Sequence, residues 1–87
     1  MDLFLRDRSA LVTGSSKGIG LAVAKSLAAE GCHLHLASRT ETDLEVAASE
    51  IRDTFGVDVT SHVVDLSHSQ DQASLAASCK NVDILVN

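Results

Sequence analysis

Apolar and polar positions divide the chain into short apolar runs of strand length and longer stretches with helical spacing. The apolar runs lie at residues 8–13, 32–38, 57–64 and 82–86, and the helical stretches lie at residues 17–30, 40–55 and 69–80. Strands that alternate with helices through short connections are typical of a parallel sheet with right-handed crossovers. The pattern therefore predicts an α/β protein with the element order β-α-β-α-β-α-β.

Apolar spacing also predicts which face of each helix is buried. Ile19, Val23 and Leu27 recur every four residues and predict the core stripe of the first helix. The inward positions predicted for the second and third helices are Leu44, Ala48, Ile51, Phe55, Leu75, Ala76 and Cys79.

Polar residues predict where the later helices begin. Thr40 with Asp43, and Ser67 with Gln70, have the spacing of capping boxes, in which two side chains satisfy backbone N–H groups of the first turn. Gly56 is expected to end the second helix, because glycine readily adopts the left-handed conformation of a helix C-terminus.

The predicted sheet is a doubly wound parallel sheet with the strand order 3-2-1-4. This order places the first two helices on one face and the third helix on the other, and it leaves the run at 82–86 as an apolar edge. We therefore expect residues 1–87 to be the N-terminal part of one longer domain. The alternative is a complete small domain that dimerises to cover its open face.

Composition excludes several classes of partner. The net charge of −5 argues against nucleic acids and anionic membranes, and no apolar run approaches the 18 residues that a membrane span requires. Residues 1–8 are too charged for a signal peptide. The two cysteines lack a CxxC spacing, so we interpret them as reduced, buried thiols of a cytoplasmic protein.

A glycine-rich turn at residues 13–20 joins the first strand to the first helix. Gly14, Gly18 and Gly20 allow a tight turn and a close approach of a ligand to the backbone. The unpaired N–H groups and the dipole of the following helix favour an anion such as a pyrophosphate. Ser15 and Ser16 offer hydroxyl and N–H groups to phosphate or ribose, although ordinary loop serines explain them equally well.

Three motifs together resemble the short-chain dehydrogenase/reductase family. Residues 13–20 are similar to its TGxxxGxG cofactor turn, Asp65 follows the third strand as its adenine-binding aspartate does, and residues 83–87 look like the start of its DxLVNNAG segment. The resemblance implies a Rossmann domain, of which these residues are the N-terminal part. The cofactor-binding residues that it implies are Gly14, Ser15, Ser16, Lys17, Gly18, Ile19, Gly20, Ser38, Arg39, Asp65, Leu66 and Asn87. Asp65 also suits a helix cap.

The end of the second strand indicates the cofactor. Enzymes that use NAD place a carboxylate there, on the ribose 2′-hydroxyl. Here the position is Ser38 followed by Arg39, and an arginine fork suits a 2′-phosphate. Lys17 is placed to reach the same phosphate. We therefore predict NADP(H) over NAD(H), although Glu41 lies close by and solvated surface charge is the alternative for both cations.

The resemblance implies an oxidoreductase that interconverts a small-molecule alcohol and a carbonyl compound, as a homodimer or homotetramer. Its catalytic Ser, Tyr and Lys are expected beyond Asn87, and the chain contains no tyrosine, so the 87 residues alone should be inactive. A non-catalytic NADP(H)-binding regulatory protein is the alternative. An epimerase or dehydratase of the extended branch is disfavoured by the glycine spacing.

The histidines offer one possible metal pair. His33 and His35 share a face of the predicted second strand, but the sequence places no third ligand beside them, and His62 and His68 fall on other elements. We therefore expect no metal site.

Overall fold

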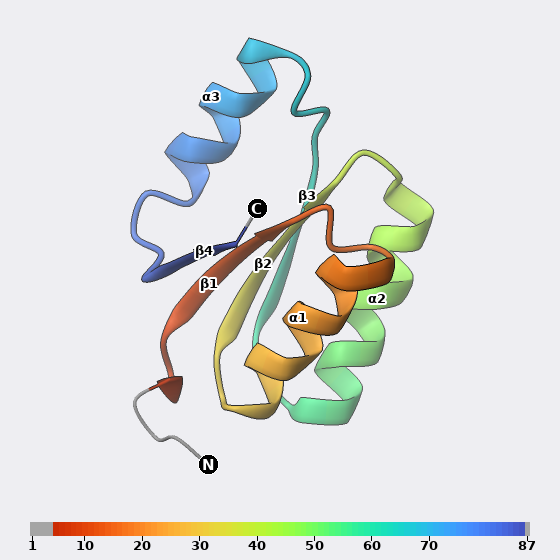
Figure 1. The fold of residues 1–87 in the computed structure, drawn as a ribbon, viewed down its shortest axis with the longest axis vertical. Coiled ribbons are helices and arrows are strands. Elements are labelled where there is room, and N and C mark those ends of the chain that lie inside the picture. The colour runs from red at the N-terminus through yellow and green to blue at the C-terminus, as the bar shows by residue number, and fades with distance from the viewer. Residues whose placement is uncertain (1–4, 87) are drawn as a thin grey trace.

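The computed structural model describes residues 5–86 and contains a four-stranded parallel sheet with the order β3-β2-β1-β4 (Figure 1). Both the predicted element order and the predicted strand order are confirmed. The elements are β1 (Ser9–Thr13), α1 (Gly18–Ala29), β2 (His33–Ser38), α2 (Glu41–Phe55), β3 (Val59–Val63), α3 (Ser69–Ser78) and β4 (Ile84–Val86).

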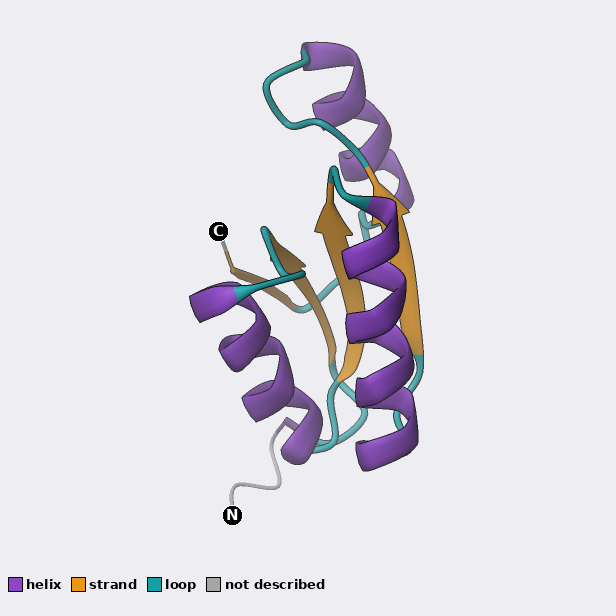
Figure 2. Ribbon diagram, turned by 90° about the vertical axis from the view of Figure 1, so that its right-hand side faces the viewer, coloured by secondary structure: helices purple, strands orange, loops and turns teal. Residues whose placement is uncertain are grey.

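Helices cover the two faces of the sheet unequally. Helices α1 and α2 pack side by side on one face, whereas α3 stands apart from them (Figure 2). The core between the sheet and α1 and α2 contains Leu34, Leu36, Leu44 and Ile51, which are all fully buried or nearly so. The opposite face has a smaller core of Leu11, Ala37, Leu75 and Cys79. Parallel strands are usually covered on both faces. Within the described residues, two helices cover one face and only α3 covers the other, so the face of α3 is the more exposed of the two.

The predicted stripe of α1 is only partly correct, because Leu27 packs against the buried core and Val23 is half-buried, whereas Ile19 is not buried. Ile19 is 84% exposed, and the buried positions of the helix are Ala24 and Ala28. Gly20 is four residues before Ala24 and is in close contact with the glycine turn. The most buried positions of the helix are therefore small residues, because its start is seated closely, and Leu21 and Leu27 pack at the margin of the core.

The predicted capping boxes are also wrong, although the predicted helix starts are close. Thr40 precedes α2 without a side-chain capping bond, and His68 takes the N-cap position of α3, again without one. The Ser67 hydroxyl is used instead in a bond to Asp65. Gly56 does end α2, with φ of 69° in the left-handed region.

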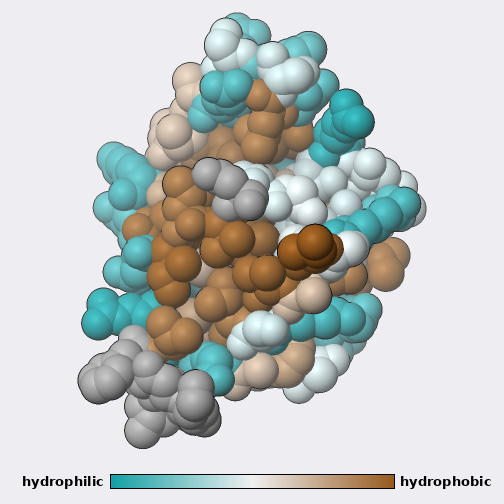
Figure 3. Space-filling model, viewed as in Figure 1, coloured by the Kyte–Doolittle hydropathy of each residue, from teal (hydrophilic) through white to brown (hydrophobic). Residues whose placement is uncertain are grey.

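Hydrophobic surface gathers over β1, β4 and the gap between them and α3 (Figure 3). Leu85 on the edge strand is 60% exposed, and Ala76 lies on the predicted inward face of α3 but stays exposed, because it lines an open cavity between this helix and the sheet. Within residues 5–86, none of the helices combines the length and the apolar character that crossing a bilayer requires.

Asp83 holds the start of the edge strand in place. Its Oδ2 accepts a hydrogen bond from the backbone N–H of Ser9 at 2.9 Å, and its own N–H donates to the carbonyl of Ser9 at 2.8 Å. Arg8 lies 3.7 Å from the other carboxylate oxygen. The first residue of the segment at 83–87 therefore joins β4 to β1, at the opposite end of the sheet from the glycine turn.

Candidate functional site

The glycine turn after β1 needs its glycines for two different reasons. Gly14 and Gly18 have φ of 63° and 61°, a region that disfavours side chains, although a Cβ on either would meet open space. Gly20 has an ordinary φ but no room. An added Cβ would lie 2.9 Å from the carbonyl carbon of Gly14, and closer still to its oxygen. The helix start is thus pressed against the turn itself.

The N-terminus of α1 is the one best suited to an anion among the three described helices. It has no side-chain cap and no acidic residue in its first turn, whereas Glu41 and Asp43 begin α2 and Asp71 lies in the first turn of α3. The first N–H groups of a helix have no partner within it. These donors, together with the positive end of the dipole, form a site for phosphate oxygens.

Hydroxyl groups connect the turn to the end of β2. Ser16 and Ser38 share a hydrogen bond between their Oγ atoms at 3.0 Å, and Ser38 Oγ also accepts from the N–H of Thr40 at 3.4 Å. Ser15 is fully buried, and its Oγ has no partner among the described residues. Ser16, rather than Ser15, therefore has the hydroxyl that borders the site.

A cavity of about 380 Å³ lies beside this turn, at the carboxyl ends of β1, β2 and β3. Ligands of open α/β sheets bind at this end, where the loops after neighbouring strands meet. Five of the predicted residues line it, namely Gly14, Ser38, Arg39, Asp65 and Leu66. Residues 15–20 do not line the cavity, and Asn87 lies outside the described residues.

Lys17 is placed differently from Arg39. Its Nζ lies 3.1 Å from Asp43 Oδ2, and its side chain is 78% exposed. A phosphate that recruits Lys17 has to compete with the Asp43 carboxylate, whereas Arg39 lines the cavity directly. Of the two predicted basic contacts, Arg39 is therefore better placed than Lys17 to bind a phosphate in this cavity.

Asp65 shapes the loop that enters α3. Its Oδ1 accepts from the hydroxyl of Ser67 at 2.7 Å and from the N–H of Ser67 at 2.9 Å. The bond from the hydroxyl, then that from the backbone, hold the pKa of Asp65 below its usual value, and nearby His68 and Arg39 act in the same direction against a contribution from burial. The carboxylate is thus ionised while it lines the cavity.

Replacing Ser67 with alanine should raise the pKa of Asp65, because the stronger of its two donors is lost. A carboxylate with a folded pKa below its unfolded pKa stabilises the fold above the unfolded pKa, and that stability is lost as the pH falls through the folded pKa. The variant should therefore lose less stability on acidification. Carbon NMR titration of the Asp65 carboxyl measures the shift, with Ser26→Ala on the outer side of α1 as the control. An unchanged pKa contradicts the assignment.

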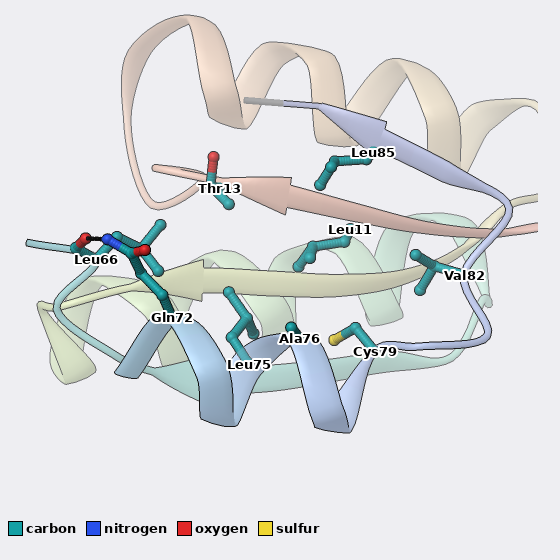
Figure 4. Close-up of a pocket in the computed structure, with 9 residues that line it drawn as sticks. All are labelled: Leu11, Thr13, Leu66, Gln72, Leu75, Ala76, Cys79, Val82 and Leu85. Atoms are coloured by element: carbon teal, nitrogen blue, oxygen red, sulfur yellow. Dashed lines mark hydrogen bonds between the residues drawn. The ribbon is translucent and has the colours of Figure 1, made fainter. Parts of the chain in front are cut away.

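An apolar cavity of about 430 Å³ lies between α3 and strands β1 and β4 (Figure 4). Leu11, Leu75 and Leu85 point into it, and its lining includes no charged side chain. Gln72 closes one end by donating to the carbonyl of Leu66 at 2.6 Å. The two polar side chains of its lining, Thr13 and Gln72, already donate to backbone carbonyls, so this cavity is poorly suited to phosphate groups.

The two histidines of β2 have different partners. His33 accepts from the N–H of Asp58 at its Nδ1 and contacts Asp7 Oδ1 at its Nε2, so both ring nitrogens are engaged. His35 instead contacts His62 of β3. His33 and His35, which the sequence offered only as a possible metal pair, therefore do not act together, and sequence spacing did not reveal the contact of His35 with the neighbouring strand.

The sequence model of the short chain dehydrogenase family matches residues 8–87. L-xylulose reductase of Mesocricetus auratus is 41% identical over 87 residues, which are 100% of this chain and 34% of that protein. Inactive hydroxysteroid dehydrogenase-like protein 1 of Homo sapiens is 40% identical over 83 residues, which cover 92% of this chain and 25% of that protein. The chain spans about a third, or less, of the curated relatives it matches.

The fold also resembles that of solved structures. L-sorbose reductase of Gluconobacter frateurii, solved as a complex with NADPH and L-sorbose, superposes with a TM-score of 0.94 and 37% sequence identity. The superposition covers 100% of this chain and 35% of the reductase.

Proposed function

Because this chain belongs to the short-chain dehydrogenase family, we propose that its protein is an NADP(H)-dependent oxidoreductase that interconverts an alcohol and a carbonyl compound. The cavity beside the glycine turn carries this proposal. The end of β2 contributes Ser38 and Arg39 to that cavity, where NAD enzymes have a carboxylate. The NADPH in the structure of the sorbose reductase further supports the phosphorylated cofactor.

The described residues fit such a cofactor in three parts. The uncapped start of α1 suits the pyrophosphate, the end of β2 suits the 2′-phosphate, and the loop after β3 suits the adenine. When bound, NADP(H) supplies or accepts the hydride. We assign the chain's contacts to Gly14, Ser15, Ser16, Lys17, Gly18, Ile19, Gly20, Ser38, Arg39, Asp65, Leu66 and Asn87, with the hydroxyl of Ser16 preferred to the buried one of Ser15.

The remaining chemistry is proposed for other parts of the protein. The chain has no tyrosine, so the acid/base residue that the family uses is not among these 87 residues, and we propose that they are inactive alone. Cys32 and Cys79 are free thiols in separate cores, in keeping with a reducing, cytoplasmic location. A homodimer or homotetramer is proposed by analogy with the family.

A non-catalytic NADP(H)-binding protein is the second candidate. The human relative named as inactive is 40% identical over 83 residues, so a similar region occurs in a protein of that description. Cofactor binding and catalysis therefore need separate measurements, because fold alone does not settle activity.

The complete protein should bind NADPH more tightly than NADH and oxidise NADPH in the presence of a small ketone or ketose. Calorimetric titration measures the two affinities, and the loss of NADPH absorbance measures turnover. Failure to bind either cofactor contradicts both candidates. Tight NADPH binding without turnover across a broad panel of carbonyl and alcohol substrates contradicts the enzyme and favours the second candidate.

A further inference from the structure

Three side chains from separate elements meet on the face of the sheet that α3 covers. They are His35 of β2, His62 of β3 and Cys79, which directly follows α3. Each offers one ligand atom, and these three atoms all lie within 4.8 Å of one another. The cluster lies outside the cofactor cavity, none of whose lining residues belongs to it.

The strand register brings the two histidines together. Residues 35 and 37 of β2 pair with residues 60 and 62 of β3, so His35 and His62 lie diagonally on one face of the sheet. Their rings stack with centroids 5.1 Å apart, and His35 Nδ1 lies 2.9 Å from His62 Nε2. Cys79 Sγ points toward the sheet (Figure 4) and lies 3.6 Å from the same Nε2.

Hydrogen bonding satisfies this arrangement only in part. An imidazole nitrogen carries either one hydrogen or one lone pair in the ring plane, so it makes one good hydrogen bond. Here both His35 Nδ1 and Cys79 Sγ approach His62 Nε2. Three electron-pair donors that lie this close together can be satisfied by a cation that binds all three.

We propose that His35 Nδ1, His62 Nε2 and Cys79 Sγ form a zinc-binding site that fastens α3 to the sheet. Two imidazoles and a thiolate are donors that Zn²⁺ prefers and that Mg²⁺ and Ca²⁺ do not. Binding breaks the S–H bond of Cys79 and forms a sulfur–zinc bond, and the proton passes to solvent. This site was not expected from the sequence.

Two of the three donor distances are close to those of tetrahedral zinc. At ordinary zinc bond lengths, two nitrogen ligands lie about 3.3 Å apart and a nitrogen and a sulfur about 3.6 Å apart. The sulfur is already at this spacing from His62, and the two nitrogens have to separate by about 0.4 Å. His35 Nδ1 and Cys79 Sγ lie within 4.8 Å of each other and would have to approach the spacing of about 3.6 Å. A cavity of about 70 Å³, lined by His35, Cys79, Ser9 and Asn81 among others, provides space for a water as the fourth ligand.

Zinc would have a clear structural effect here. Helix α3 has only Leu75 buried within its length, and Cys79 adds a second buried residue just after its end. It therefore has little apolar anchorage. A metal bond at Cys79 would fix the C-terminal end of α3 to the sheet. The loop that lines the cofactor cavity leads into the other, N-terminal end of this helix.

The test uses the complete protein, stripped with a chelator, desalted and titrated with Zn²⁺ and separately with Co²⁺. We expect one equivalent of zinc that Cys79→Ala and His62→Gln bind at least about 100-fold more weakly, since even partners outside the ligand shell contribute 10–100-fold. Co²⁺ should give a thiolate charge-transfer band that Cys79→Ala abolishes. Zinc should also raise the melting temperature of the wild type but not of these variants.

Cys32→Ala and His68→Gln are the matched controls, because Cys32 is buried in the other core and His68 is exposed. Both should keep the equivalent of zinc and the cobalt band. Zinc affinity that is equal in all four variants, or a cobalt spectrum without a thiolate band in the wild type, overturns the site. Circular dichroism checks the folding of Cys79→Ala, and His35→Gln replaces it in the comparison if it is unfolded.

Discussion

Replacing Arg39 with alanine should weaken NADPH binding by about 10- to 100-fold and leave NADH binding almost unchanged. Arg39 lines the cavity at the end of β2, and its guanidinium is permanently charged. Hydrogen bonds to charged groups contribute about 1.5–3 kcal/mol each, which corresponds to this range of affinity. NADH has no 2′-phosphate, so removing the Arg39 side chain should not change its affinity.

Calorimetric titration of the complete protein with each cofactor measures the difference. Lys80→Ala is the control, because it also removes one positive charge. Lys80 follows the C-terminal end of α3 and does not line the cofactor cavity. It should leave both affinities nearly unchanged. Equal losses for NADPH and NADH in Arg39→Ala would place Arg39 against a part that both cofactors share, and the 2′-phosphate assignment would be wrong.

Arg39 is expected to bind the 2′-phosphate more strongly than Lys17 does. From sequence alone, Arg39 was the main predicted contact to the 2′-phosphate, and Lys17 was expected to reach the same phosphate from the glycine turn. In the folded chain Asp43 pairs with Lys17, and Arg39 faces the cavity. Side-chain partners across the start of α2 depend on how the glycine turn is oriented, which spacing along the chain does not specify.

Strand order and site location were predictable for a common reason. Alternating strands and helices have few allowed topologies, and all loops after parallel strands meet at one end of the sheet. Ser38, the last residue of β2, and Asp65, which follows β3, therefore had to approach Gly14, which follows β1. No side-chain detail was needed for that conclusion.

Helix faces and contacts between strands were less predictable. A search for apolar spacing gives weight to Ile19 and ignores Gly20, yet Gly20 is the residue that contacts the backbone of the turn, whereas Ile19 is exposed. The contact of His35 with His62 depends on the register of β2 against β3. A shift of one residue would move either side chain to the opposite face, and sequence pattern alone did not fix that choice.

Replacing Gly20 with alanine should destabilise the protein by about 3 kcal/mol, at the upper end of the usual effect of overpacking. The atoms that a Cβ would meet belong to the backbone of Gly14 and Ser15, so no side-chain rotation relieves the clash. Helix α1 would have to lift away from the turn, and its N–H groups would move from the proposed pyrophosphate position. The variant should therefore lose NADPH affinity as well as stability.

Gly56→Ala separates this steric effect from the conformational one. Gly56 has φ of 69° and nothing near its Cβ position, so alanine there should destabilise by only about 1–2 kcal/mol and leave cofactor binding intact. Urea denaturation of the complete protein without cofactor measures both changes, and calorimetric titration measures binding. If Gly20→Ala is no more destabilising than Gly56→Ala, α1 is not pressed against the turn in solution. The tight seating of its N-terminus, on which the placement of the pyrophosphate rests, would then be wrong.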